Sequence, residues 1–157
     1  DTLLLTTGNK SEVSVGYFTL YGDSAGAFNP LLDVYKTKVY ELSRHRNRYL
    51  VHEAIPREII DKPPSAELRE DQKDTDSLPP YEVLDKILKM HIEKCMTSKE
   101  IIASGLVSEV SAEEILRIIK LVQRSEHKRQ QTVLGSKISP IAFGIGRRMP
   151  NVNRFNL

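Results

Sequence analysis

The sequence predicts an α/β fold in which a short parallel strand near the N-terminus is followed by a mostly helical chain. The apolar run Leu3–Leu5 breaks off into small polar residues, and apolar residues at helical spacing follow from Val13 to Leu20. A second helical pattern runs through residues 81–131. A strand, a tight polar loop and a helix form the unit that places a ligand beside the carboxyl end of a parallel strand. We therefore expect a buried strand at Leu3–Leu5 with a binding site at its end.

The loop after this strand carries groups that suit a phosphate ligand. Thr6 and Thr7 offer hydroxyls, and Gly8 lets a ligand approach the backbone closely. The first turn of the following helix exposes N–H groups that suit phosphate, and the Glu12 carboxylate could hold a magnesium ion between phosphates. A purely structural interpretation is also complete, with Ser11 as the helix cap and Glu12 favoured by the helix dipole. The residues alone favour the structural interpretation.

The composition describes one soluble domain without a strong charge. At 157 residues the chain is long enough for a single domain with a core. Its net charge of +2 is too small to argue for nucleic acid or a membrane surface, and no apolar run approaches the length of a membrane span. Cys95 is the only cysteine, so no internal disulfide is possible and a reducing cytoplasm fits.

The middle of the chain alternates helical patterns with one long irregular stretch. Residues 22–30 are rich in Gly, Ala and Asn and predict a loop, whereas residues 33–45 predict a helix. Residues 55–60 predict a helical turn that starts at a proline. Residues 61–80 have two Pro-Pro pairs, many charges and no helical or strand period. Irregular stretches of this length are usually binding loops or linkers, and composition leaves these two interpretations nearly even.

The second half of the chain predicts several capped helices. One apolar stripe lies at helical spacing and consists of Val83, Leu84, Ile87, Leu88 and His91. Thr97 and Ser111 each begin a capping-box sequence, and Gly105 can end the first of these helices in the left-handed conformation. The helix after Ser111 turns an apolar set inward, namely Ile115, Ile118, Ile119 and Val122. Residues 132–157 form a basic tail punctuated by Gly and Pro.

Several motifs occur in one order along the chain and together carry a resemblance to a known family. The first is Thr6-Thr7-Gly8-Asn9-Lys10-Ser11-Glu12, followed by Gly16-Tyr17-Phe18-Thr19-Leu20-Tyr21-Gly22-Asp23. The others are Lys36-Thr37, Val39-Tyr40-Glu41-Leu42, Lys62-Pro63-Pro64-Ser65-Ala66-Glu67-Leu68-Arg69, Asp71-Gln72-Lys73-Asp74, Ser77-Leu78-Pro79-Pro80-Tyr81 and Glu126-His127-Lys128-Arg129-Gln130. This set covers nearly the whole chain and resembles the synthetase domain of glutamine-dependent NAD synthetases. One such motif would be weak, but their common order makes the resemblance specific.

The resemblance implies the C-terminal part of a doubly wound parallel-sheet domain of the adenine nucleotide alpha-hydrolase-like type, mostly helical in this chain. Residues 1–60 would supply the nucleotide-site strand and helices, residues 61–80 an active-site loop, residues 81–131 a helical region and residues 132–157 the basic tail. The implied enzyme is a ligase that converts deamido-NAD to NAD, using ATP and ammonia released from glutamine. In this reaction the nicotinate carboxylate attacks the α-phosphorus of ATP, which gives an adenylate and pyrophosphate, and ammonia then displaces AMP from the adenylate.

The resemblance also implies roles for individual residues, although none is assigned as catalytic. ATP would be bound by Thr7, Lys36 and Ser65. Deamido-NAD would be bound by Glu12, Tyr17, Phe18, Leu20, His127 and Lys128. Glu12 would in addition bind Mg²⁺, the metal that accompanies ATP. Without the ordered motif set, each of these residues has an ordinary structural explanation.

One element of the family pattern is missing from this sequence. Such synthetases use a Ser-Gly-Gly-x-Asp-Ser loop to hold pyrophosphate, and none of the eight glycines lies in such a sequence. The chain begins with Asp1 rather than Met, so we expect this loop, further strands and a glutaminase domain to lie upstream in a longer protein. We expect the chain alone to be inactive. The intact enzyme is expected to be a cytoplasmic homo-oligomer that contacts neither membrane nor nucleic acid.

Two other functions stay open. Residues 97–129 predict a short helix, a loop and a longer helix ending in basic residues, which is the outline of a helix-turn-helix nucleic-acid-binding module. The connection is longer than the usual turn of such modules. The second helix also carries few basic residues, whereas DNA affinity needs several phosphate contacts. The remaining alternative is a regulatory fragment that binds nucleotide without turnover.

Overall fold

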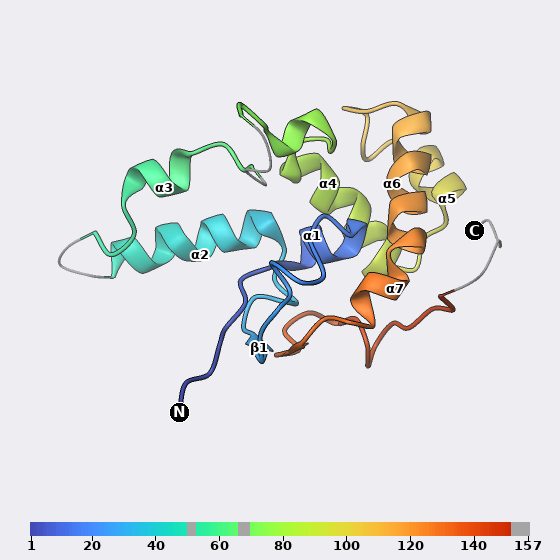
Figure 1. Cartoon of the computed structure of the whole chain (residues 1–157). Coiled ribbons are helices and arrows are strands. Elements are labelled where there is room, and N and C mark those ends of the chain that lie inside the picture. Colours follow the sequence, from blue (N-terminus) through green and yellow to red (C-terminus); the bar gives the residue numbers. More distant parts are fainter. Residues whose placement is uncertain (50–52, 66–69, 152–157) are drawn as a thin grey trace.

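The computed structural model describes residues 1–49, 53–65 and 70–151, and its regular structure is mainly helical (Figure 1). The helices are α1 (Lys10–Val15), α2 (Lys36–Arg48), α3 (Arg57–Asp61), α4 (Tyr81–Leu88), α5 (Ser98–Ser104), α6 (Ala112–Arg124) and α7 (Glu126–Arg129). A 3-10 turn, η1 (Asp74–Asp76), precedes α4, and a π-helical turn, η2 (Lys89–Glu93), continues it. The parts of the predictions that concern residues 50–52, 66–69 and 152–157 lie outside the described residues. Within the described ranges, no helix is both long and apolar enough to cross a bilayer.

Helix α1 lies at the centre of the molecule, where it contacts α2, α4 and α6 (Figure 1). It begins with a capping box at Asn9, whose side chain accepts the Glu12 N–H (3.1 Å) while the Glu12 carboxylate accepts the Asn9 N–H (3.2 Å). The prediction of Ser11 as the cap is wrong, because Ser11 lies within the first turn and is buried. The helix ends at Gly16, which has a φ of 73°, a conformation that glycine adopts without strain. It is therefore shorter than predicted, and the residues from Tyr17 onward form a loop.

The main hydrophobic core lies between α4, η2, α5 and α6. The predicted stripe is confirmed, since all of its members are buried: Val83, Leu84, Ile87, Leu88 and His91. The inward-facing set of α6 is buried as well, namely Ile115, Ile118, Ile119 and Val122. The predicted capping box at Thr97 is confirmed, because the Thr97 hydroxyl accepts the Glu100 N–H (3.3 Å) and the Glu100 carboxylate accepts the Thr97 N–H (2.8 Å). At Ser111 the cap is confirmed but not the full box: the Ser111 hydroxyl accepts the Glu114 N–H (3.3 Å), whereas the Glu114 carboxylate accepts from Arg117. Gly105 ends α5 with a φ of 62°.

The parallel sheet is smaller than the sequence predicts and lies elsewhere in the chain. Strand β1 (Phe28–Asn29), inside the stretch predicted as a loop, pairs in parallel with β2 (Leu134–Gly135) of the tail. Leu5 adds only an isolated parallel bridge to Phe28. The prediction of a buried strand at Leu3–Leu5 is wrong for this structure, since these three leucines are 66%, 65% and 53% exposed. An apolar run is buried only where neighbouring strands and helices cover it, and among the described residues this one has a single bridge.

The C-terminal tail joins this sheet and is fixed against the base of α1. The Ser139 hydroxyl donates to Asp33 (2.8 Å), and the Ser139 backbone N–H donates to the same carboxylate (2.6 Å). The ammonium of Lys10, fully buried, pairs with Asp33 (2.9 Å) and donates to the Ile141 carbonyl (2.7 Å). Burial alone would raise the pKa of Asp33, but hydrogen bonds from Lys10 and from the tail hold it below its usual value. The tail therefore stabilises the element that carries Glu12.

Helices α2 and α3 form an arm that extends to one side of the molecule (Figure 1). Helix α2 starts at Lys36 rather than near Asp33, because Asp33 and the two residues after it are buried against the tail and α1 in a non-helical turn. No residue of α2 is buried. Helix α3 starts directly after Pro56, as the sequence predicts. The arm therefore contributes to the site only through its first turn.

Candidate functional site

A pocket of about 540 Å³ opens beside α1, between the start of α2, the loop after α1 and the segment that precedes α4. Its lining residues are Thr7, Gly8, Glu12, Gly16, Tyr17, Phe18, Thr19, Asp23, Lys36, Ser65, Gln72, Asp74 and Lys128. Every residue predicted to bind ATP, deamido-NAD or metal lines this pocket except Leu20 and His127. The structure thus brings together side chains that lie more than a hundred positions apart in the sequence.

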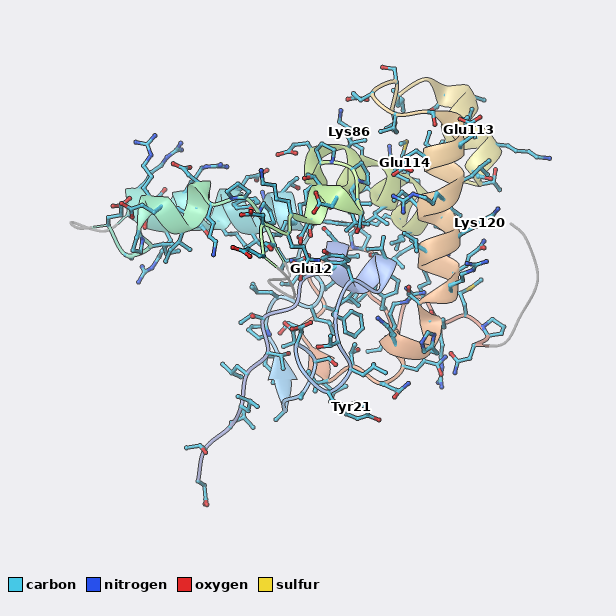
Figure 2. All side chains as sticks on the ribbon, turned by 45° about the horizontal axis from the view of Figure 1, so that its top comes forward. Glu12, Tyr21, Lys86, Glu113, Glu114 and Lys120 are labelled. Carbon is cyan, nitrogen blue, oxygen red and sulfur yellow. The ribbon has the colours of Figure 1, made fainter. Side chains whose placement is uncertain are left out.

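Glu12 and Lys36 supply opposite charges that contact each other inside the pocket. The Lys36 ammonium lies 3.1 Å from Glu12 Oε1, and both side chains are partly exposed. Lys36 also lies over the Tyr81 ring, 5.5 Å from its centroid. Figure 2 shows Glu12 near the centre of the molecule, whereas Tyr21 projects from the loop after α1. A phosphate with its metal ion could take the place of this ion pair, with the anion at Lys36 and the cation at Glu12.

The position of Lys36 depends on a buried carboxylate in α4. Asp85 accepts the Ser11 hydroxyl (2.5 Å) and both the backbone N–H (3.0 Å) and the hydroxyl (2.7 Å) of Thr37. The Ser11 hydroxyl in turn accepts the Lys36 N–H (2.9 Å). Burial raises the pKa of Asp85, and the hydrogen bonds from Ser11 and Thr37 oppose that rise. This network joins α1, α2 and α4 and holds the first turn of α2 at the edge of the pocket.

Tyr17 and Phe18, which follow α1, form one side of the pocket, referred to below as the aromatic wall. The Lys128 ammonium donates to the carbonyl oxygens of Gly16 and Phe18, both at 2.8 Å. It also lies 5.2 Å from the centroid of the Phe18 ring. Lys128 therefore holds the aromatic wall against α7 with two of its three N–H groups. The sequence predicted Lys128 only as a direct contact to deamido-NAD.

Residues 61–80 were predicted to lack regular structure, and that prediction is wrong for their second half. The turn η1 lies there, and the Asp74 N–H donates to the Pro64 carbonyl oxygen (2.9 Å). This hydrogen bond closes the base of the loop immediately beside Ser65. It gives a structural reason why Ser65 lies in the pocket.

Asp74 is a pocket residue that the sequence analysis did not select. It is 4% exposed, and its Oδ2 accepts the Tyr81 hydroxyl (2.6 Å). The neighbouring Gln72 donates from its side-chain amide to the Tyr17 oxygen (3.4 Å). Both residues belong to the motif Asp71–Asp74, which carries part of the family resemblance but had no predicted role. That motif was the available signal.

Leu20 and His127 lie outside the pocket lining. His127 is exposed, and its Nδ1 lies 2.9 Å from the Arg124 carbonyl oxygen. Thr19 and Asp23, which were not predicted, line the pocket instead, and the Asp23 carboxylate accepts the Thr19 N–H (2.8 Å). The predicted roles of Leu20 and His127 therefore gain no support from the geometry.

The pocket residues suit a metal ion that is bound jointly by a protein carboxylate and by substrate phosphates. Among the described residues, no group of three or more His, Cys, Asp or Glu side chains is placed to hold a metal ion. Mg²⁺ is usually bound by one or two carboxylates together with substrate phosphates and waters. Glu12, which lies in an open pocket next to Lys36, suits that mode of binding.

Comparison with known proteins identifies the family. The sequence model described as NAD synthase matches residues 1–132. The chain belongs to the NAD synthase family. It is 52% identical over 151 residues to the glutamine-dependent NAD(+) synthetase of Acinetobacter baylyi and 48% identical over 153 residues to that of Aquifex aeolicus. These matches cover 96% and 98% of this chain but 27% and 26% of the relatives, so this NAD synthase chain spans about a quarter of their length.

Solved structures confirm the fold class. The glutamine-dependent NAD(+) synthetase of Cytophaga hutchinsonii is 22% identical with a TM-score of 0.74, over 98% of this chain and 25% of that one. The NMN synthetase of Francisella tularensis is 29% identical with a TM-score of 0.61, over 89% of this chain and 47% of that one. This NAD synthase chain is thus part of an adenine nucleotide alpha-hydrolase-like α/β domain, mostly helical with a small parallel sheet. The helix-turn-helix alternative is not supported.

Proposed function

We propose that this chain supplies part of the synthetase site of a glutamine-dependent NAD synthetase, which amidates deamido-NAD to NAD with consumption of ATP. One observation carries the proposal. A single pocket of a chain from this family gathers hydroxyls, a carboxylate, an ammonium and aromatic side chains from separate elements. These are the groups that the reaction needs, because two anionic substrates must be aligned and their repulsion reduced before they react.

ATP is assigned to the side of the pocket that contains Thr7, Lys36 and Ser65. The ammonium of Lys36 is a compact charge on a flexible stem, so it can turn from Glu12 to a phosphate oxygen when the nucleotide enters. The hydroxyls of Thr7 and Ser65, which line the same pocket, donate to phosphate oxygens. The pair with Glu12 keeps the Lys36 charge inside the pocket before ATP binds.

Glu12 is the residue that we assign to Mg²⁺. When bound, this metal neutralises charge on the pyrophosphate that leaves. One oxygen of the Glu12 carboxylate is also part of the helix cap at Asn9. The cap fixes the direction of the side chain, so that Glu12 is oriented before any ligand arrives.

Deamido-NAD is assigned to the aromatic wall. Tyr17 and Phe18 offer ring faces for its bases, and Lys128 retains a third N–H with which to contact the ligand beyond the two carbonyls that it already holds. Leu20 and His127 are assigned to the same substrate by resemblance alone. With the dinucleotide held there and ATP at Lys36, the nicotinate carboxylate attacks the α-phosphorus, and the bond to the β-phosphate breaks so that pyrophosphate leaves. Ammonia then attacks the activated carbonyl, and AMP leaves.

The remaining assignments concern the whole protein. Ammonia is proposed to come from a glutaminase domain acting on glutamine, in line with the names of the relatives. We further propose that the enzyme is a homo-oligomer and acts in the cytoplasm.

The test is a product assay on the full-length protein. With ATP, Mg²⁺, deamido-NAD and either glutamine or ammonium, we expect NAD, AMP and pyrophosphate in equal amounts. Nicotinate mononucleotide is the comparison substrate, because one structural neighbour is an NMN synthetase. Preference for that mononucleotide, or nucleotide binding without any amide product, would contradict the proposal.

A further inference from the structure

Asp74 has a buried carboxylate oxygen that lacks a hydrogen-bond partner within the described part of the chain. Its Oδ2 accepts the Tyr81 hydroxyl at 2.6 Å, whereas Oδ1 is shielded from solvent and unpaired. Buried carboxylate oxygens in native proteins are nearly always hydrogen-bonded, so each exception calls for an explanation. Because Asp74 also lines the pocket, we look for the reason for its unpaired oxygen in the binding site.

The phenol of Tyr17 is the group that can donate the missing hydrogen bond to Asp74 Oδ1. Tyr17 and Asp74 line the same pocket, and burial together with the neighbouring charge of Asp74 raises the pKa of Tyr17. Gln72 donates to the Tyr17 oxygen at 3.4 Å, so the phenol accepts a hydrogen bond on that side. Its own O–H can then turn toward Asp74 Oδ1.

Asp74 also connects the elements that surround the pocket. Its backbone N–H holds the base of the loop that carries Ser65, through the Pro64 carbonyl (2.9 Å). Its side chain holds Tyr81 at the start of α4. Pairing with Tyr17 would therefore join the loop that carries Ser65 to the aromatic wall. The loop residue Ser65 is assigned to ATP, and the aromatic wall is assigned to deamido-NAD.

We propose that Asp74 is a positioning residue for deamido-NAD, which accepts the Tyr17 hydroxyl when the ligand packs against the aromatic wall. The proposal rests on the function proposed above. Asp74 acts through Tyr17 and does not touch the ligand, since Oδ1 is shielded from solvent. The bond orients the Tyr17 ring and holds it against the base of the loop beside Ser65.

The kinetic test compares Asp74→Asn with Asp76→Asn in the full-length protein. Asparagine at position 74 keeps one acceptor oxygen for Tyr81 but presents an amide N–H₂ on the side of Tyr17. We expect the KM for deamido-NAD to rise about tenfold, with kcat and the KM for ATP within about twofold. Asp76 lies in the same turn but is exposed and outside this pocket, so Asp76→Asn should change none of these constants. A purely structural role for Asp74 would lower the fraction of active enzyme, and hence kcat, without changing KM.

Tyr17→Phe keeps the proposal falsifiable if Asp74→Asn folds poorly, and a spectroscopic measurement follows the Tyr17 phenol directly. Tyr17→Phe should raise the same KM by a similar factor, and adding Asp74→Asn to it should have no further effect. Independent, additive effects would overturn the proposal. In protein labelled with 3-fluorotyrosine and saturated with deamido-NAD, the Tyr17 resonance, identified by its loss in Tyr17→Phe, should shift more in Asp74→Asn than in Asp76→Asn. An unshifted resonance overturns the pairing, whereas a shifted resonance without any NAD formation overturns only the proposed function.

Discussion

Replacing Glu12 separates its part in the helix cap from its part in metal binding. Glu12→Gln keeps an oxygen that can accept the Asn9 N–H, but it removes the charge that pairs with Lys36 and would bind Mg²⁺. Glu12→Ala removes the ion pair, the metal ligand and the carboxylate that accepts the Asn9 N–H, whereas the Asn9 side chain still accepts the backbone N–H of residue 12. The two variants therefore differ in stability by the value of the hydrogen bond from the Asn9 N–H to the side chain of residue 12, and they share the same loss of charge.

The contacts that each variant loses set the expected changes in stability and in activity. A lost side chain–backbone hydrogen bond costs about 1 kcal/mol, and a partly exposed ion pair such as Glu12–Lys36 contributes at most about 1 kcal/mol. We expect the free energy of unfolding to fall by about 1–2 kcal/mol in Glu12→Ala and by less than about 1 kcal/mol in Glu12→Gln. Loss of groups that merely support a metal ligand costs about 10–100-fold in activity, so loss of the ligand should reduce adenylation at least about 100-fold in both variants. That factor corresponds to about 2.7 kcal/mol in the activation barrier.

The assay measures pyrophosphate release from ATP and deamido-NAD over a Mg²⁺ titration, alongside urea denaturation of each variant. The expected result is a similar, large loss of magnesium-dependent adenylation in Glu12→Gln and Glu12→Ala, with a smaller loss of stability in Glu12→Gln. If Glu12→Gln adenylates deamido-NAD at the wild-type rate and with the same Mg²⁺ dependence, Glu12 is only a helix-start residue and the metal assignment is refuted.

Three further predictions concern stability and the loop. Lys10→Met should lower the free energy of unfolding by about 3–5 kcal/mol, because it leaves Asp33 and Glu93 without their buried partner; denaturant melts measure this, and adding Asp33→Asn should restore part of the loss. Burial lowers the pKa of His91 in the folded protein below its ordinary 6.5. The free energy of unfolding should therefore be constant above pH 6.5 and fall by up to about 1.4 kcal/mol per pH unit as the pH drops from 6.5 to the folded pKa. His91→Gln should reduce this pH dependence of stability, and an unchanged pH dependence would show that another group causes it. Limited proteolysis within residues 61–80 should slow when ATP and deamido-NAD are both present, whereas equal cutting with and without ligands would make this stretch a linker.

The sequence by itself determined the features that depend on neighbours in the chain. Helical spacing identified the buried faces of α4 and α6, and capping chemistry located the starts of α5 and α6 at Thr97 and Ser111. Such signals suffice because a helix is built from contacts three and four residues apart. The ordered motifs identified the family and most of the residues that line the pocket.

The tertiary structure decided everything that depends on a distant partner. Leu3–Leu5 has the composition of a buried strand, yet it is exposed because burial depends on which elements cover it. No spacing rule predicts that Lys128 holds the carbonyls of the aromatic wall or that Asp85 fixes the start of α2. Asp74 is the clearest case, because its sequence neighbours explain neither its burial nor its unpaired oxygen. These properties arise from hydrogen bonds between residues that only folding brings together, so they are absent from any local pattern in the sequence.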